Sequence, residues 1–213
     1  MNEYLEPSEF LDFIEPEFQG YIKPFKSIEN EKERAITLYN KVRDSFLYNP
    51  YHLDLRHNAL KATTIIKNKR AWCVEKAIVL AAAFRACSIP SRLGYGIVVN
   101  HIGVEKLTTF LKRKEIVFHG YVEAYIDDKW VKCTPAFDPL VCKIAGVPIL
   151  DWNGETDALF HAYNGKDKFM EYIHFYGDFD DVPIKLMNDE MKKYYPHLFV
   201  ETHNSKVFSF FHL

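Results

Sequence analysis

The sequence predicts an α+β fold in which helices come first and an antiparallel sheet follows. Two observations support this. The first half contains one amphipathic and one almost wholly apolar helical segment, and the second half contains an alternating segment that turns back on itself as a hairpin. Strands and helices do not alternate regularly, so a parallel βαβ sheet is not expected. With 213 residues, of which 48% are hydrophobic, the chain is long enough to bury a sizeable core.

The first half is expected to be helical. Residues 1–30 carry three prolines between aromatic residues, and we expect short helices and turns there, forming an N-terminal appendage. The next segment is predicted to be an amphipathic helix ending near Asn49–Pro50, because apolar residues recur at three- and four-residue steps: Ala35, Leu38, Val42 and Phe46. Residues 61–70 are read as a short helix or turn. From Cys73 to about Cys87 the segment is apolar on most sides, which is typical of a buried helix.

The second half is expected to supply the sheet. Residues 91–99 are predicted to be a strand, and "VEKLTTFLKRK" a surface helix. Residues 117–126 alternate, "DDK" forms a turn, and residues 130–134 return, so this region is predicted to be a β-hairpin. The following region, including "MEYIHFYGDFDDVP", is interpreted as loop-rich with short strands, and "LMNDEMKKYYPHLF" as a closing helix. The expected division is 1–30 appendage, 31–185 main domain and 186–213 helical tail.

Charge and cysteine content exclude several classes of protein. The formal net charge is −2, which favours neither nucleic acid nor a membrane surface as partner. We see no signal peptide and no apolar stretch of ~18 residues, so a cytoplasmic location is expected. The four cysteines include no Cys-x-x-Cys pair, which argues against a disulfide framework and a structural zinc site. We therefore expect no cofactor and no metal. The group Asp151, Glu155, Asp157 and His161 is interpreted as a solvated loop rather than a metal site.

Cys73 differs from the other cysteines because it begins the predicted buried helix. Unpaired N–H groups and the helix dipole favour a thiolate at such a position. Lys67, Lys69 and Arg70 precede it and add positive potential. Cys87 and Cys142 lie in apolar surroundings and are interpreted as small buried hydrophobic residues. Cys73 is therefore the candidate nucleophile.

A cysteine nucleophile needs a base, and His119 is the best placed histidine. It lies in the first strand of the predicted hairpin, where strand pairing would orient its side chain. The competing interpretation is a histidine half-buried against the core. Five other histidines remain possible bases because spacing does not exclude them: His52, His57, His101, His161 and His174.

Two ordered motifs resemble those of the transglutaminase-like superfamily. "AWCVEKAIVLAAAFRACSIPSRLGYG" resembles its first motif, a cysteine heading a buried helix that leads into a strand, and "HGYVEAYIDDKWVKCTPAF" resembles its second. Further segments resemble a bacterial-type branch, so that the likeness covers roughly residues 30 to 185. The resemblance implies a papain-like, transglutaminase-like core, with the buried helix that carries the cysteine packed on an antiparallel sheet.

The resemblance also implies roles for individual residues. Cys73 would be the nucleophile and His119 the base. The aspartate that orients the histidine in this superfamily aligns with Thr134, which brings no negative charge; Asp138 is the alternative orienting group. Trp72, Tyr95 and Tyr121 are candidates for lining the substrate cleft, although each has core packing as its competing interpretation.

The expected function is that of a cysteine-dependent acyl-group enzyme acting on a peptide, protein or amide substrate through a thioester. Hydrolysis is favoured over amine transfer because no separate amine site can be read from the sequence. One alternative is a non-catalytic binding module with a degraded triad, which Thr134 favours. Another is a metal-dependent hydrolase that uses the histidines. The sequence gives neither the substrate nor the oligomeric state.

Overall fold

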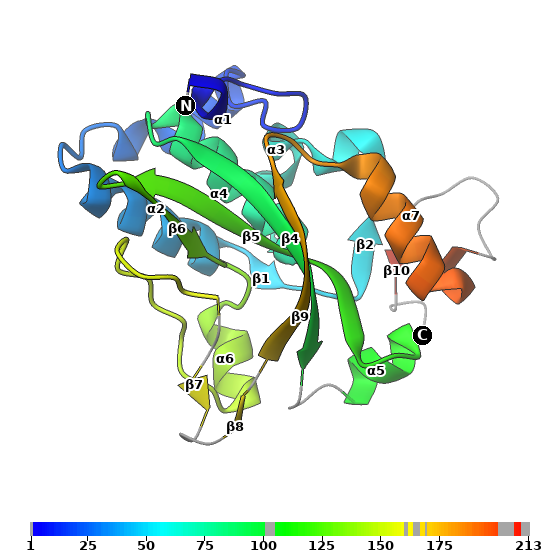
Figure 1. Ribbon diagram of the computed structural model, residues 1–213. Coiled ribbons are helices and arrows are strands. Elements are labelled where there is room, and N and C mark those ends of the chain that lie inside the picture. The colour runs from blue at the N-terminus through cyan, green and yellow to red at the C-terminus, as the bar shows by residue number, and fades with distance from the viewer. Residues whose placement is uncertain are drawn as a thin grey trace.

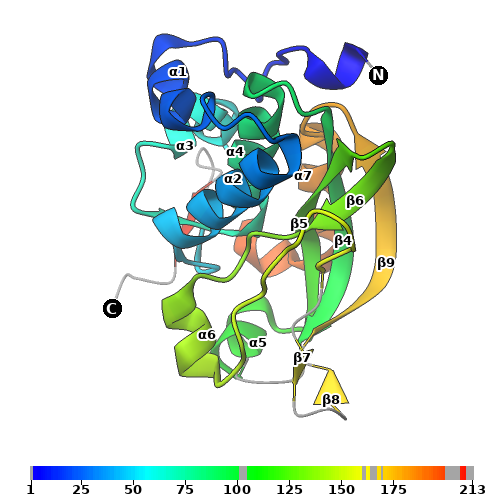
Figure 2. The ribbon, with the colours of Figure 1, turned by 90° about the vertical axis from the view of Figure 1, so that its left-hand side faces the viewer.

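The computed structural model describes residues 2–100, 105–159, 162–163, 167–168, 170–199 and 207–209. Its centre is a four-stranded antiparallel sheet in the order β6-β5-β4-β9. Helices α2 (Glu31–Ser45), α4 (Cys73–Ala86) and α7 (Ile184–Tyr194) lie on one side of this sheet (Figures 1 and 2). The predicted α+β class, with a buried helix packed on an antiparallel sheet, is confirmed. The four strands are β4 (Ser91–Asn100), β5 (Glu115–Ile126), β6 (Lys129–Cys133) and β9 (Met170–Phe179).

Helix α2 (Glu31–Ser45) begins where the side chain of Asn30 accepts a hydrogen bond from the Glu33 N–H at 2.9 Å. It ends at Ser45, before the predicted end near Asn49–Pro50. The chain turns extended there because β1 (Leu47–Tyr48) pairs in parallel with β3 (Arg70–Ala71). Backbone bonds to this short partner therefore replace the last expected turn of the helix.

Helix α4 (Cys73–Ala86) is the buried helix that the apolar run predicts. Its residues from Cys73 to Arg85 are all buried. The side chain of Glu75 reaches back and accepts a hydrogen bond from the Trp72 N–H at 3.0 Å, which caps the first turn. The hydrogen bond of this cap and the burial of the helix together hold Cys73 in place.

Shorter elements surround this core. The N-terminal segment forms short helices as predicted, residues 61–70 contain a short helix, and the predicted surface and closing helices are present. Bounds are η1 (Asn2–Leu5), α1 (Pro16–Ile22), η2 (Lys23–Phe25), β2 (His52–Asp54), η3 (His57–Leu60), α3 (Ala62–Ile65), α5 (Glu105–Leu111), α6 (Pro139–Ala145), β7 (Ala162–Tyr163), β8 (Asp167–Lys168), α7 (Ile184–Tyr194), η4 (Pro196–Phe199) and β10 (Val207–Ser209). In the part of the chain given above, no helix is long and apolar enough to cross a membrane.

The predicted hairpin is confirmed as β5 and β6. Asp127 and Asp128 connect the two strands with positive φ angles of 50° and 62°. Two consecutive residues in this region form the turn whose twist matches that of a two-stranded ribbon. Aspartate tolerates this conformation better than most residues do, which explains why the "DDK" sequence can turn here.

Strand β9 is a long strand where the sequence indicated mainly loop. It pairs with β4 along most of its length, with two register shifts. Glycines on β4 make room for rings that cross it. A Cβ atom added to Gly96 would lie 2.6 Å from the ring of Tyr172, and one added to Gly94 would lie 2.1 Å from the ring of Tyr121. Glycine at position 96 therefore allows Tyr172 to reach its place beside His119, and glycine at position 94 makes room for Tyr121.

Candidate active site

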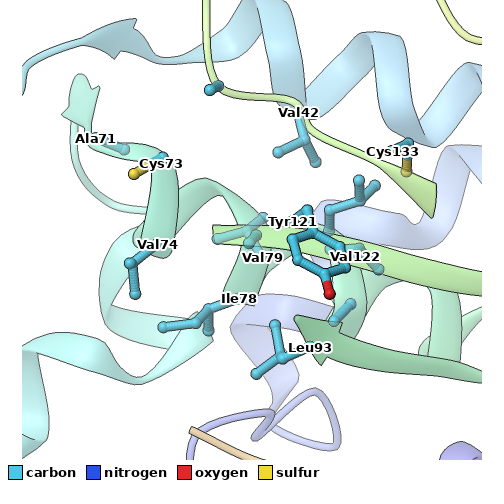
Figure 3. Close-up of a cluster of buried hydrophobic side chains, with 14 of the residues drawn as sticks. Val42, Ala71, Cys73, Val74, Ile78, Val79, Leu93, Tyr121, Val122 and Cys133 are labelled. Atoms are coloured by element: carbon cyan, nitrogen blue, oxygen red, sulfur yellow. The ribbon is translucent and has the colours of Figure 1, made fainter. Parts of the chain in front are cut away.

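Cys73 lies against strand β5 at Gly120, the residue that follows His119. Figure 3 shows it in the first turn of α4, within a cluster of buried side chains. A Cβ atom added to Gly120 would lie 3.1 Å from the Cα of Val74 and 3.2 Å from the carbonyl oxygen of Cys73. Because Gly120 has no side chain, the helix start and the strand come into direct contact. This contact brings the two predicted catalytic residues, distant in sequence, to one place.

The Cys73 thiol is buried, with 1% of the residue exposed. Burial raises the pKa of this thiol to about 11, although the N–H groups of Gly120 and Val74 and the hydroxyl of Tyr48 act in the opposite direction. A pKa of this value favours the neutral thiol at neutral pH. Desolvation thus acts against the thiolate that the helix start and the preceding cations favour, and which protonation state the resting thiol has stays a prediction.

His119 is also buried, with 1% exposed, and its Nδ1 lies 2.7 Å from the hydroxyl oxygen of Tyr172. Burial, and next the neighbouring Cys73, raise the pKa of Tyr172 well above its usual value, so its hydroxyl is neutral. The hydroxyl of Tyr172 bonds His119, and Cys73 is near enough to raise the pKa of Tyr172. The three groups therefore form one cluster, drawn from α4, β5 and β9.

Tyr172 is the residue that the sequence analysis missed. It lies on β9, where Tyr172, His174 and Tyr176 recur at every second position, which is the period of a strand. Ile173 and Phe175 between them are also apolar, so the expected contrast between alternate positions is hidden. That period-two spacing of ring side chains is the signal that could have identified the strand.

Neither Thr134 nor Asp138 orients His119 as predicted. The hydroxyl of Thr134 donates to the carbonyl of Gly120 at 3.1 Å. The carboxylate of Asp138 caps α6, accepting from the Leu140 N–H at 2.9 Å, and also accepts from the Tyr48 N–H at 2.6 Å. Both are buried and committed to backbone groups. They hold Gly120 and Tyr48, two of the residues whose polar groups contact the Cys73 thiol, and so support the candidate nucleophile rather than the candidate base.

A small cavity of about 20 Å³ lies beside Cys73 and is called the thiol cavity below. Trp72 lines it and is 3% exposed, and its role in binding substrate stays a prediction. The indole N–H of Trp72 is also buried and has no hydrogen-bond partner among the described residues. A cavity of this volume has room for about one water molecule and is far smaller than the roughly 300–1,000 Å³ of pockets that bind small ligands. Substrate entry therefore requires lining side chains to move.

Tyr95 and Tyr121 do not belong to the described lining of the thiol cavity, and a role for either in the substrate cleft stays a prediction. Tyr95 is fully buried and packs on the ring of Phe118, with centroids 4.9 Å apart. Tyr121 lies over Gly94, and its hydroxyl is 3.4 Å from a carboxylate oxygen of Asp178. Both rings therefore pack against neighbouring residues of the sheet.

The acidic loop residues have other partners. Asp151 pairs with Arg43 at 2.9 Å, Glu155 pairs with Lys32 at 2.7 Å, and Asp157 accepts from the backbone of Lys132. His161, the fourth member of that group, lies outside the described residues, as does His101. Within the described ranges, no three histidine, cysteine or acidic side chains are grouped as metal ligands would be.

The sequence profile of the transglutaminase-like superfamily matches residues 20–135. No curated protein matches the chain. A solved structure of a protein from Cytophaga hutchinsonii, which carries the provisional name of cysteine protease, is 22% identical with a TM-score of 0.49. That match covers 64% of this chain and 42% of the other, so the chain spans less than half the length of that protein.

Proposed function

Because this chain belongs to the transglutaminase-like superfamily, we propose that it is a cysteine-dependent enzyme that transfers acyl groups from a peptide or amide bond. Membership supports a cysteine-dependent enzyme in general. The observation that carries the proposal is the cluster in which Cys73, at the start of α4, meets β5 beside His119, whose Nδ1 is bonded to Tyr172. A nucleophile, a base and a group that orients the base are the parts such chemistry needs.

A neutral resting thiol favours general-base catalysis over a preformed thiolate–imidazolium pair. In the proposed step, His119 accepts the proton of the Cys73 thiol as the sulfur attacks a substrate carbonyl. The backbone N–H of Cys73, at the helix start, helps to hold the oxygen that becomes negative. The protonated His119 then gives its proton to the departing amine, which leaves a thioester on Cys73. Water resolves the thioester and restores the thiol.

Tyr172 takes the place that a carboxylate has in the family pattern. When the tyrosine hydroxyl accepts a hydrogen bond from Nδ1–H, the other ring nitrogen, Nε2, keeps its lone pair and can act as the base. The hydroxyl can still accept that bond after the ring is protonated. Since a neutral oxygen stabilises imidazolium less than a carboxylate does, His119 is expected to be a weaker base than in a complete cysteine–histidine–aspartate triad.

We favour hydrolysis of a peptide, protein or amide substrate over transfer to an amine. Water is the default acceptor for a thioester, and the thiol cavity of about 20 Å³ is lined mainly by apolar side chains such as Trp72 and Leu53. An acceptor amine would need polar groups to position it.

The test is direct capture of the acyl intermediate. The folded protein is incubated with p-nitrophenyl acetate, quenched in acid and mapped by mass spectrometry. We expect acetylation of Cys73 in the wild type and none at this position in Cys73→Ala. His119→Ala is expected to slow the acylation by about 100-fold or more. His174→Ala, an exposed histidine on β9, serves as the matched control and is expected to react at the wild-type rate.

A non-catalytic binding module is the second candidate. The small thiol cavity, the raised pKa of Cys73 and the absence of a carboxylate at Thr134 favour it. A folded protein whose Cys73 is not acylated, or is acylated equally fast without His119, would favour this candidate over the enzyme.

A further inference from the structure

A second, much larger cavity lies beside the start of α4. Its volume is about 770 Å³, and we call it the polar cavity. Buried Asn49, Asp54 and Glu75 contribute to its lining, and so do exposed Arg56, Lys69 and Arg70. Clefts of about 300–1,000 Å³ are the usual size for binding small ligands. Nothing in the proposed chemistry of Cys73 uses this cavity.

One stretch of chain separates the polar cavity from the thiol cavity. In residues 48–54, Asn49, His52 and Asp54 line the polar cavity, whereas Tyr48 and Leu53 line the thiol cavity. Strand β2 explains part of this division, since successive side chains of a strand point to opposite faces. The lining also divides at the start of α4, where Ala71 lines the polar cavity and Cys73 lines the thiol cavity. The two cavities are therefore neighbours across a wall one strand thick.

The charges that line the polar cavity do not cancel. The Arg56 guanidinium bonds the Asp54 carboxylate at 2.6 Å and 2.9 Å, so this pair is neutral overall. Burial raises the pKa of Glu75 to about 8, so most of its carboxyl is protonated at neutral pH. Lys69 and Arg70 form no ion pair with any residue that the structure describes. Two cations therefore remain without compensation.

The neutral groups of the lining indicate what kind of anion would fit. Asn49, Asn58, Asn68 and Thr64 offer amide and hydroxyl groups, which both donate and accept hydrogen bonds. A small inorganic anion such as sulfate, which offers acceptors only, would leave many of them without a partner and would fill little of the volume. An extended peptide offers backbone donors and acceptors together with acidic side chains.

We infer that the polar cavity binds the acidic part of a peptide substrate, with Lys69 and Arg70 pairing with its carboxylate. The inference rests on the proposed function for its link to catalysis. Residues 70–73 run from one cavity to the other, so a peptide lying along them would present an acidic residue at Arg70 and a nearby carbonyl at Cys73.

The test measures binding without turnover. Cys73→Ala protein is titrated into two fluorescein-labelled pools of hexapeptides that differ only in one fixed position, glutamate in one pool and glutamine in the other. We expect the glutamate pool to bind about tenfold more tightly, as one well-formed ion pair allows. The preference is expected to disappear in Lys69→Gln/Arg70→Gln and to persist in Lys67→Gln. Lys67 is the matched control because it is an exposed neighbour that pairs with Glu17 outside the cavity lining.

The outcomes separate this inference from the proposed function. Equal binding of the two pools, or a preference that survives the double substitution, would overturn the inference, even where Cys73 is acylated by the activated ester. A glutamate preference that depends on Lys69 and Arg70 supports it, even where Cys73 proves unreactive.

Discussion

The Cys73 sulfur is subject to two opposing effects. Residues visible in the sequence, the helix start and the preceding cations, favour the thiolate. Burial favours the neutral thiol and is the larger effect, since the pKa rises to about 11. Lys67 pairs with Glu17, while Lys69 and Arg70 are exposed to solvent, where water screens their charge.

The first prediction concerns the pH dependence of this thiol. Alkylation requires the thiolate, so the rate at Cys73 should rise about tenfold per pH unit between pH 7 and 10 without levelling off. The alkylation rate of a free cysteine would level off near pH 9, its ordinary pKa. The measurement is iodoacetamide labelling followed by peptide mapping, which separates Cys73 from the other three cysteines. A rate already constant below pH 7 would instead demonstrate a thiolate–imidazolium pair.

The second prediction concerns Tyr172. Tyr172→Phe keeps the ring over Gly96 and removes only the hydroxyl that bonds His119. We expect acylation of Cys73 to slow by roughly fivefold, because one hydrogen bond worth about 1 kcal/mol no longer selects the ring orientation and tautomer. Tyr121→Phe is the control, since its hydroxyl faces Asp178 rather than the histidine. Equal rates in the two variants would remove Tyr172 from the site.

The site was partly predictable from single residues. Cys73 and His119 could be chosen as candidates because each occupies a recognisable position, a helix start and a hairpin strand, and their catalytic roles stay predictions. The group that contacts the histidine could not, because alignment along β6 indicated Thr134 whereas the structure supplies Tyr172 from β9, across the other edge of β4. A partner brought by sheet pairing between distant segments leaves no local pattern in the sequence.

Among the elements, α4 carries an unusual cap. Glu75 accepts a hydrogen bond from the Trp72 N–H, yet the carboxyl is 6% exposed and burial raises its pKa to about 8. Its neighbour Lys76 is fully buried and donates to the carbonyls of Arg43, Phe46 and Ala136. The first turn of the helix is thus fixed by polar groups in an apolar setting, which keeps Cys73 in place.

The third prediction follows from this cap. The folded pKa of Glu75 is raised above its unfolded value of 4.5, so its contribution to stability is complete below pH 4.5 and is lost as pH rises through about 8. The side chain of Glu75→Gln cannot ionise. As the pH rises from 4.5 to 8.5, the free energy of unfolding of this variant should therefore increase by a few kcal/mol relative to that of the wild type. Urea unfolding at both pH values measures this change. Exposed Glu105→Gln is the control, and an identical pH slope for Glu75→Gln and wild type would contradict the argument.

Element prediction was accurate where local chemistry decides. The hairpin turn at Asp127–Asp128, strand β4 and helix α4 all have strong local signals. The end of α2 and the length of β9 were missed because each depends on pairing with a distant strand, β3 in one case and β4 in the other. Helical periodicity in residues 31–46 gives no information about such pairing.

At the scale of the whole molecule, the N-terminal segment shares the main core. Phe10, Leu11, Phe18 and Ile22 are buried together with the side chains of α4. The backbone of Ala62 also donates to the carbonyl of Phe10 at 2.9 Å. The divisions expected at residues 30 and 185 remain predictions.

The fourth prediction tests how much the N-terminal segment contributes. Leu11 is 0% exposed, so Leu11→Ala should lower the free energy of unfolding by about 3 kcal/mol. Ile14 lies three residues further along and is 62% exposed, so Ile14→Ala should change it by no more than about 0.5 kcal/mol. Thermal and urea unfolding measure both. Equal, small effects would show that residues 1–30 fold apart from the domain.

Arg85, near the end of α4, joins segments from three regions of the chain. Its guanidinium donates to the carbonyls of Glu6, Ser91 and Asp180. If either chain segment near Glu6 or Asp180 detached, a largely buried cation would lose its acceptors, which is costly. Fraying at these two places is therefore coupled energetically, and we expect their amide protons to exchange with solvent through one shared opening event rather than independently.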